Sequence, residues 1–302
     1  MKEIVLITGS SGNLAKSVIL LLGKFYEVRS LTTNRRLVNQ QNIFYWDINN
    51  KYLDERALYN CNHIIHLAGY SIMKRWSKKN KKLMYNSRVE GANLLFQQSK
   101  KLNIAVFTFI SASAIGYYGF SAIGSKKESD QIGNDWVSDM VNKWENSADQ
   151  FKQLGARVIQ MRISLLLSNY SGFLKAYLLS MRYGLVFMFG NKKKKINWIY
   201  INDVVRFIHQ SLNNKKYKGR YNLSAREYIT QEDLIQQLKT NLFPCVLTIK
   251  IPDFFVKLLL GDRVKVINTD FIVDTEKLNK HAFFCKYNNF KELLVMLKEN
   301  SN

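Results

Sequence analysis

The chain is poor in cysteine, and its three cysteines stand alone. Cys61, Cys245 and Cys285 are far apart in the sequence and odd in number. They form neither a disulfide framework nor a metal-ligand spacing, so we expect no metal site. Solitary thiols are typical of a reducing compartment, which predicts a cytoplasmic protein.

Long apolar runs are missing as well. The most apolar later region, residues 173–189, is interrupted by Lys175 and Arg182. It is therefore too short and too charged to span a bilayer. The first residues are strand-like and lack the basic, apolar and small-residue regions of a signal peptide. We expect no membrane partner.

Acidic residues are scarce: 23 Asp and Glu face 45 Lys and Arg, which gives a formal net charge of +22. The lysines are spread along the whole chain among many Asn, Ile and Tyr residues, a mixture typical of an A+T-rich genome. The one basic run, Lys192–Lys195, is either a solvated loop or a rim that attracts an anionic substrate. Because no nucleic-acid-binding module accompanies the charge, a nucleic-acid-associated protein is the weakest alternative.

Apolar residues are plentiful enough for a large core. The 302 residues are 47% apolar and 13% aromatic, which argues against a disordered chain and suits one large or two modest domains. The sequence shows no internal repeat and no low-complexity linker.

The first residues predict a strand, a tight glycine turn and a helix. Residues 4–7 are an apolar run, and the turn Thr8–Gly12 leads into an apolar helix over 14–22. Gly9 can adopt backbone angles that other residues avoid, and Gly12 has no Cβ to obstruct a ligand. The helix then offers unpaired N–H groups and its positive end to an anion. The pattern predicts a pyrophosphate cradle for a dinucleotide, and an ordinary strand-to-helix turn is the alternative.

Strands alternate with helices through the first half, which predicts a parallel sheet built from right-handed crossovers. Beyond residue 169 the alternation loosens into a smaller α+β region, which we expect over the carboxyl ends of the sheet, where the ligand cleft lies in open α/β folds. There, Thr230 followed by Asp233 resembles a helix N-cap. The small-residue segment 111–114 is predicted as a turn. The predicted strands are 4–7, 27–32, 43–46, 63–67, 106–110, 157–163, 221–223 and 246–251, and the helices are 14–22, 79–101, 135–153, 173–183, 201–212 and 290–298.

Several segments, which run nearly end to end, are distinctive as a set: ITGSSGNLA, HLAG, Arg75-Trp76, NSR at 86–88, ISASAIGYYG, Trp144-Glu145, WIYIND, YNLSA and LLLGDR. Together they resemble the extended short-chain dehydrogenase/reductase superfamily, and in particular the NAD-dependent epimerase/dehydratase-like branch of the YfcH type. ISASAIGYYG is long and unusual, which makes the match specific.

The resemblance implies an α/β fold, a Rossmann-like doubly wound parallel sheet with a smaller C-terminal α+β substrate region. Residues 1–168 would form the NADP-binding domain, completed by a returning segment near 196–224, and residues 169–302 would be mainly substrate-side. Members of the branch bind NADP(H). Most have no established reaction, so the resemblance names no substrate.

The expected cofactor is NADP(H) rather than NAD(H). NAD enzymes usually carry an acidic residue after the second strand, whereas here Thr32 is followed by Thr33, Asn34, Arg35 and Arg36. Guanidinium groups pair well with a 2′-phosphate. The family places a basic residue where Thr33 stands, so the interpretation requires Arg35 or Arg36 to substitute, and two solvated loop arginines are the alternative.

Further cofactor contacts follow from the resemblance. Asp47 matches a position that contacts adenine, with a surface carboxylate as the alternative, and the small residues after Leu67 would allow close approach of the adenine ribose. The predicted cofactor-binding residues are Thr8, Gly9, Ser11, Gly12, Asn13, Leu14, Thr32, Arg35, Arg36, Asp47, Leu67, Ala68, Gly69, Arg88 and Ser111.

The expected chemistry lacks its usual relay. Relatives use a Ser, a Tyr that transfers the proton, and a Lys four residues later on the same helix face. Ser113 occupies the Ser position, but Met140 and Trp144 stand where Tyr and Lys are expected. Tyr117 and Tyr118 are the next candidates for a general acid, and hydrophobic wall residues are the alternative.

On the substrate side, Arg75 and Trp76 combine anion binding with stacking, and Arg88, also counted with the cofactor residues, would be costly to bury unpaired. A surface Arg and a core Trp are the alternatives. Tyr200 would line the same pocket, together with Asp203 unless that residue caps a helix. We therefore expect an NADP(H)-dependent oxidoreductase or epimerase-like enzyme for a small polar or anionic substrate. The alternative is a non-catalytic NADP(H) sensor, which would explain the missing Tyr-Lys pair.

Overall fold

The computed structural model describes residues 2–38, 40–189, 191–267 and 269–299. Contacts divide the chain into two compact units. The first comprises residues 1–114, 136–162 and 205–221, and the second comprises residues 115–135, 163–204 and 222–302.

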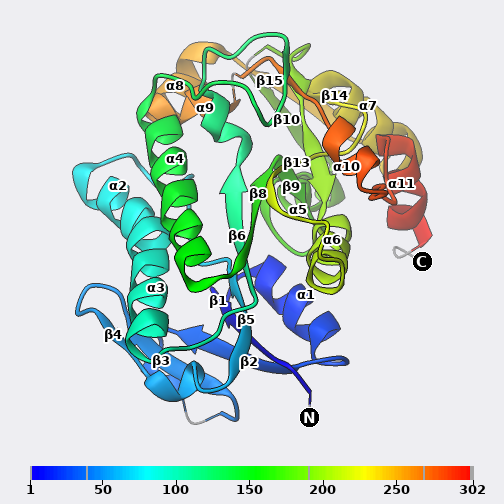
Figure 1. Ribbon diagram of the computed structural model, residues 1–302. Helices are drawn as coiled ribbons and strands as arrows, with labels where there is room; N and C mark the ends of the chain where they lie inside the picture. The colour runs from blue at the N-terminus through cyan, green and yellow to red at the C-terminus, as the bar shows by residue number, and fades with distance from the viewer. Residues whose placement is uncertain (1, 39, 190, 268, 300–302) are drawn as a thin grey trace. The chain divides into compact units, whose positions relative to one another are not determined.

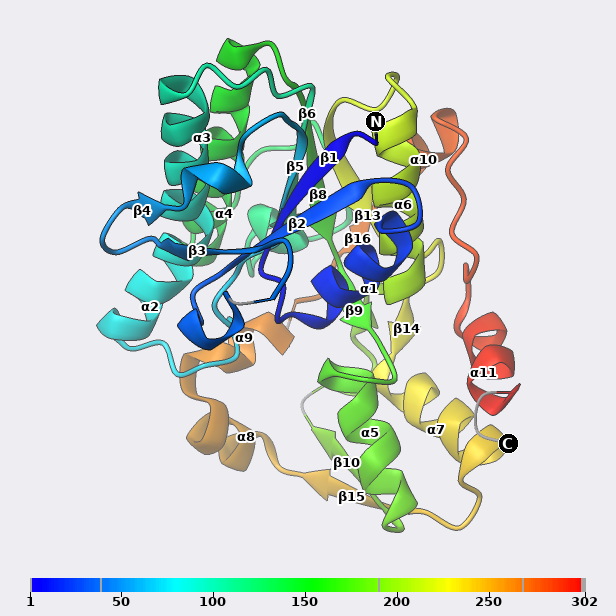
Figure 2. The same ribbon diagram turned by 90° about the horizontal axis from the view of Figure 1, so that it is seen from below.

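The first unit is built on an eight-stranded sheet in the order β13-β8-β6-β5-β1-β2-β3-β4. The strands from β6 to β3 pair in parallel, and β4 adds an antiparallel edge. Helices α3 and α4 cover one face, and α1 and α6 the other (Figures 1 and 2). The predicted doubly wound α/β fold is thus confirmed. Its elements are β1 (Ile4–Thr8), α1 (Asn13–Leu22), β2 (Glu27–Thr32), η1 (Arg35–Leu37), β3 (Ile43–Asp47), β4 (Tyr52–Leu53), η2 (Glu55–Ala57), β5 (Cys61–His66), α2 (Lys78–Tyr85), η3 (Asn86–Glu90), α3 (Gly91–Lys101), β6 (Thr108–Ala114), α4 (Trp136–Asp149), η5 (Gln150–Leu154), β8 (Arg157–Ile163), α6 (Ile201–Asn213) and β13 (Gly219–Leu223).

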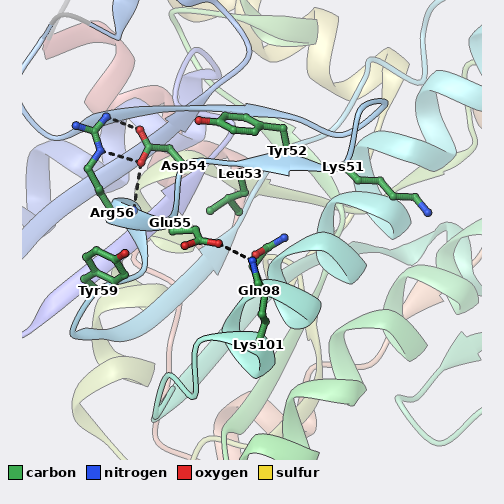
Figure 3. Close-up of a pocket in the computed structure, with 9 residues that line it drawn as sticks. All are labelled: Lys51, Tyr52, Leu53, Asp54, Glu55, Arg56, Tyr59, Gln98 and Lys101. Atoms are coloured by element: carbon green, nitrogen blue, oxygen red, sulfur yellow. Dashed lines mark hydrogen bonds and ion pairs between the residues drawn. The ribbon is translucent and has the colours of Figure 1, made fainter.

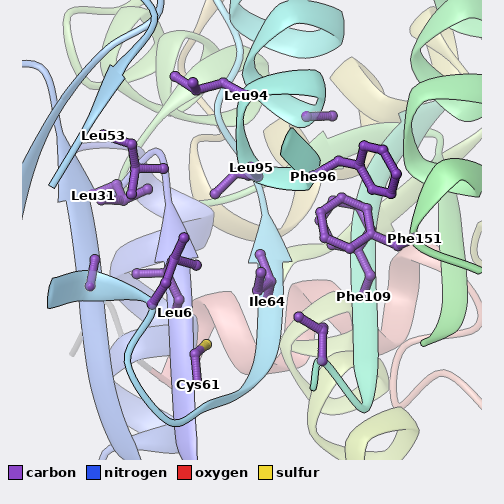
Figure 4. Packing of buried hydrophobic residues seen from close by; sticks show 14 of the residues in the cluster. Leu6, Leu31, Leu53, Cys61, Ile64, Leu94, Leu95, Phe96, Phe109 and Phe151 are labelled. Atoms are coloured by element: carbon purple, nitrogen blue, oxygen red, sulfur yellow. The ribbon is translucent and has the colours of Figure 1, made fainter. Parts of the chain in front are cut away.

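The core of this unit fills the space between the sheet and helices α3 and α4 (Figure 4). β1 is buried along its whole length, as expected for a central parallel strand. Phe109 of β6 stacks on Phe151 with ring centroids 3.7 Å apart, and Phe96 meets Phe151 edge-on. These contacts pack β6 and α3 against η5, which follows α4.

Two predictions about this unit are wrong. Residues 111–114 were expected as a turn, but they continue β6, which pairs with β5 as far as Ser111 and buries the side chains of Ser111 and Ser113. The single helix expected over 79–101 is interrupted by a π-helical turn, η3, which carries Arg88. Such turns insert one extra residue into a helix and are frequent at functional sites.

The second unit consists of short helices and two-stranded ladders. β10 pairs with β15, β12 with β9 and β16 with β7, all in parallel, while β11 pairs with β14 antiparallel. The predicted N-cap is confirmed, since the Thr230 hydroxyl accepts from the Asp233 amide at 3.0 Å. Its elements are η4 (Ile115–Tyr118), β7 (Ser125–Lys126), β9 (Leu165–Leu167), α5 (Gly172–Arg182), β10 (Leu185–Phe189), β11 (Lys195–Ile196), β12 (Trp198–Tyr200), β14 (Ile229–Thr230), α7 (Gln231–Leu242), β15 (Leu247–Ile251), α8 (Asp253–Leu260), η6 (Gly261–Arg263), α9 (Val264–Ile267), β16 (Ile272–Val273), α10 (Glu276–Lys280) and α11 (Phe290–Glu299).

Among the helices that the structure describes, none combines the length and the apolar character that crossing a membrane requires.

Candidate functional site

The glycine turn lies at the carboxyl end of β1, between β1 and α1. Gly9 has φ +73°, and a Cβ at this position would come within 2.9 Å of the Ala68 backbone. Gly12 donates its amide to the Gly9 carbonyl at 2.8 Å. Among the described residues, no side chain caps the α1 N-terminus at Gly12, and its first turn carries no acid. The positive end of α1 is therefore available to an anion.

Thr8 ties this turn to the loop after β5. Its Oγ1 accepts from the amides of Leu67 and Ala68, each at 3.1 Å, and lies 2.8 Å from Nδ1 of His66. Nε2 of His66 is 2.9 Å from the Arg88 carbonyl, which can only accept, so Nε2 carries the proton. Nδ1 must then accept from the Thr8 hydroxyl. His66 thereby links the glycine turn to η3.

His66 is a residue that the sequence interpretation missed. It is fully buried, and desolvation lowers the pKa of His66 to about 4, while its hydrogen bond to Arg88 opposes that shift only in part. The ring stays neutral at physiological pH, which suits its role as one donor and one acceptor. The HLAG segment contained the signal, because a histidine before a small-residue loop sits at the end of a central strand.

Arg88 is a half-buried cation at the same edge of the sheet. Its Nη1 donates to the carbonyls of Tyr70 at 2.9 Å and Met84 at 3.1 Å, and its guanidinium lies over the Trp144 ring at 5.2 Å. Within the described part of the chain it has no carboxylate partner, and desolvation lowers the pKa of Arg88 to about 10. Gly69 is small for a reason that the sequence did not reveal, because a Cβ there would meet Nη2 of Arg88 at 3.1 Å.

The predicted 2′-phosphate residues follow β2. Thr32 is buried and its Oγ1 accepts from the Asn34 amide, while the Asn34 side chain caps the short helix that holds both arginines. The Arg35 guanidinium lies 4.7 Å from the centre of the Tyr45 ring. Arg36 is exposed, so a ligand can reach its guanidinium.

Asp47 ends β3 and organises the turn that follows it. One carboxylate oxygen accepts from the amides of Asn49 and Asn50, and the other from the Asn50 side chain at 2.8 Å and the Tyr45 hydroxyl. The Asn50 hydrogen bonds, above all, hold the pKa of Asp47 below its ordinary value. Asp47 therefore has a structural role whether or not it also contacts adenine.

Ser113 lies at the end of β6 and is almost fully buried. Its Oγ is 2.7 Å from Oε1 of Glu145 on α4. Glu145 forms a two-pronged ion pair with Arg162, at 2.8 and 2.9 Å. Arg162 thus pairs with a buried carboxylate. Ser111, two residues earlier, donates to the neighbouring Ala112 carbonyl.

Met140 and Trp144 of α4 are both buried. Trp76 lies edge-on to Trp136 at the start of the same helix, with ring centroids 4.7 Å apart, and its Nε1 donates to the Ile72 carbonyl. Arg75 beside it is exposed. Trp136 is a second residue that the sequence interpretation missed, and its signal was the four-residue spacing that places 136, 140 and 144 on one helix face.

The remaining candidates belong to the second unit. The Tyr118 hydroxyl lies 2.7 Å from Oδ1 of Asn222 and 3.0 Å from the Lys127 carbonyl, so its hydrogen is held inside this unit. Tyr117 is half-buried and packs edge-on against Tyr118. The Tyr200 hydroxyl donates to Asn169, and burial raises the pKa of Tyr200 to about 12.

Two further sequence features have structural roles in this unit. The Asp203 carboxylate accepts from the Lys286 and Tyr287 amides. In the basic run, Lys192 pairs with Glu232, so the run is not simply a solvated stretch of positive charge.

A surface pocket of about 480 Å³ lies elsewhere, beside β4 and η2 (Figure 3). Arg56 pairs with Asp54 at 2.6 Å and Lys101 with Glu55 at 2.9 Å. Because these charges already pair and none of the predicted site residues lines it, this pocket is not our candidate site.

Together the doubly wound sheet and the glycine turn at its first βα junction define a nucleotide-binding Rossmann fold. The sequence model of the NAD dependent epimerase/dehydratase family matches residues 5–224. The chain belongs to this family. An epimerase family protein of Staphylococcus aureus is 28% identical over 291 residues, which cover 96% of this chain and 97% of that protein.

Solved structures agree with this fold. A human epimerase family protein, solved with NADPH, has a TM-score of 0.83 at 20% identity and covers 98% of this chain and 99% of its own. UDP-glucose 4-epimerase of Thermotoga maritima, solved with UDP-glucose, has a TM-score of 0.77 at 17% identity, with coverage of 99% and 100%.

Proposed function

We propose that the protein binds NADP(H) and acts as an oxidoreductase or epimerase-like enzyme of the YfcH type on a small polar or anionic substrate. The observation that carries the proposal is the α1 N-terminus, where Gly9 and Gly12 keep Cβ atoms away from an uncapped helix end. The human relative solved with NADPH supports the cofactor. The three solitary cysteines support a cytoplasmic location.

The roles assigned to the remaining residues are part of the proposal. The pyrophosphate would meet the amides of residues 11–14, and Arg36 would reach the 2′-phosphate, since the Arg35 guanidinium faces Tyr45. Arg88 would face an anionic group of cofactor or substrate. Tyr117 is the favoured general acid, because the hydrogen of the Tyr118 hydroxyl is already held by Asn222 or the Lys127 carbonyl. Residues 169–302 would supply most of the substrate side, including Tyr200.

The test compares NADPH and NADH by titration calorimetry. A charge-assisted hydrogen bond contributes roughly 1.5–3 kcal/mol, so Arg36→Ala should weaken NADPH binding by roughly 10- to 100-fold and leave NADH binding unchanged. Lys16→Ala, on the exposed side of α1, is the matched control for lost surface charge. No heat with either nucleotide would remove the whole proposal, and equal affinities would remove the NADP preference.

A non-catalytic NADP(H) sensor is the second candidate, and α4 carries the observation that favours it. The resemblance puts Met140 and Trp144 at the positions of the relay tyrosine and lysine. Both are buried, and neither side chain transfers a proton. Stereospecific hydride exchange between NADPH and a metabolite mixture separates the two candidates. The enzyme exchanges hydride and loses that exchange in Ser113→Ala, whereas the sensor binds the nucleotide without exchange.

A further inference from the structure

Ser113 has a single hydroxyl proton, and the structure fixes its direction. Oγ lies 2.7 Å from Oε1 of Glu145, with Ser113 4% exposed and Glu145 1% exposed. An ionised carboxylate has no proton to give, so the hydroxyl must donate to it. The proton of Ser113 is thereby turned away from any ligand.

Glu145 is held in the ionised state by its other partners. Arg162 donates Nε to Oε1 at 2.8 Å and Nη2 to Oε2 at 2.9 Å, and Arg220 donates Nε to Oε2 at 2.7 Å. Burial by itself would raise the pKa of Glu145, but the hydrogen bonds and charge of Arg162, together with the hydrogen bonds of Ser113 and Arg220, outweigh it and hold that pKa below its ordinary value. Each oxygen therefore already accepts two hydrogen bonds.

The surrounding groups fix the carboxylate in place. Arg220 also donates Nη2 to Asp149 at 3.2 Å. The Gln160 side chain donates to the Glu145 carbonyl at 2.7 Å and to Asp149 at 3.1 Å. The carboxylates of Glu145 and Asp149 thus lie among three cations, since Lys152 also pairs with Asp149 at 2.7 Å.

We propose that Ser113 acts as a hydrogen-bond acceptor, so that the site binds its substrate as an alcohol in preference to the carbonyl that hydride transfer makes from it. Glu145 is the positioning residue that sets this polarity. Turning the hydroxyl towards a carbonyl would break a buried charge-assisted bond, roughly twice as strong as a neutral one. The inference rests on the proposed function, and it narrows the substrate class to alcohols that bind with the oxidised nicotinamide.

Crystals of the full chain with NADP⁺, soaked separately with tert-butanol and acetone, test the substrate class. Neither probe exchanges hydride with oxidised nicotinamide, so each gives a stable complex. We expect the tert-butanol oxygen at about 2.7 Å from Ser113 Oγ and no acetone oxygen there. The inference is overturned if acetone is hydrogen-bonded to Ser113, or if neither probe binds at Ser113. In either case, NADP⁺ bound at the α1 turn would still support the proposed function.

The proton itself can be located by neutron diffraction from crystals of deuterium-exchanged protein. We expect deuterium on Ser113 Oγ pointing at Oε1 and none on Glu145. Deuterium on Glu145 would overturn the inference, and so would deuterium on Ser113 Oγ that points away from Oε1. This test does not depend on NADP⁺ binding.

Two variants separate a change in the direction of the Ser113 hydrogen bond from a general loss of folded structure. In Glu145→Gln the new side-chain amide can donate to Ser113 Oγ, which frees the Ser113 hydroxyl proton to point at a ligand. Acetone should then gain occupancy at Ser113, and tert-butanol should lose occupancy there. Asp149→Asn is the matched control, since it changes the neighbouring carboxylate without touching Ser113, and should bind as the unaltered protein does. If Glu145→Gln does not fold, the soaks and the deuterium position of the unaltered protein still decide.

Discussion

The Thr8 hydroxyl makes three hydrogen bonds in the candidate cofactor site. Thr8 is fully buried and its Oγ1 accepts from the Leu67 and Ala68 amides while it donates to His66. Thr8→Val keeps the shape of the side chain but removes all three hydrogen bonds. Leaving a buried amide unsatisfied costs roughly 1–3 kcal/mol. Because the Leu67 amide is only partly buried, we expect a total loss of roughly 2–5 kcal/mol of unfolding free energy.

Urea denaturation at pH 7 measures that loss, with NADPH titration as the second assay. Thr8→Ser is the matched control, because it keeps the hydroxyl and loses one methyl group, at about 0.8 kcal/mol. We expect NADPH affinity to fall in Thr8→Val, since the glycine turn is no longer tied to the β5 loop. A Val variant as stable as the Ser variant would refute the role that we assign to this hydroxyl.

Two further predictions concern buried charge. His66 has a folded pKa of about 4 against an ordinary 6.5, so the unfolded state binds more protons between these values. The stability that His66 contributes is fully present above pH 6.5, and the free energy of unfolding should fall by about 3 kcal/mol as the pH drops towards 4. Urea denaturation at several pH values measures this fall, which should be smaller in His66→Gln. Arg162→Met should cost roughly 3–5 kcal/mol, because it strands the buried Glu145 carboxylate. Lys143→Met, which breaks an exposed pair with Asp139, should unfold at the same urea concentration as the unaltered chain, and equal losses in the two variants would contradict this reasoning.

The order and type of the main elements were predictable from the sequence because periodicity records which faces are buried. The strand over residues 27–32 and the strand over 157–163 have the predicted bounds. The conformation of residues 111–114 was not predictable, because small side chains suit both a turn and a buried strand, and only pairing with β5 decides between them. The π-helical turn at 86–90 leaves the helical period nearly intact and gives no local signal.

The candidate site was predictable only where a residue acts through its backbone. Gly9 was identified from the turn alone, and its φ of +73° confirms the need for glycine. Hydrogen bonds between residues that are far apart in the sequence leave no such sequence pattern. The ties of Thr8 to His66 and of Ser113 to Glu145 join residues 58 and 32 positions apart, and no spacing rule reaches across those distances.

The two buried networks of the first unit differ in a way that bears on its chemistry. The network around His66 is neutral and joins turns that would hold the cofactor, so ordinary pH changes above 6.5 leave it intact. The network around Glu145 is ionic and lies beneath Ser113, where it sets the direction of one proton. The His66 network positions the turns that would bind the nucleotide, so changes in His66 should alter nucleotide affinity. The Glu145 network orients the Ser113 proton, so changes in Glu145 should alter the choice of substrate. A Glu145 variant that weakens NADPH binding as strongly as Thr8→Val would show that the two networks are not separate.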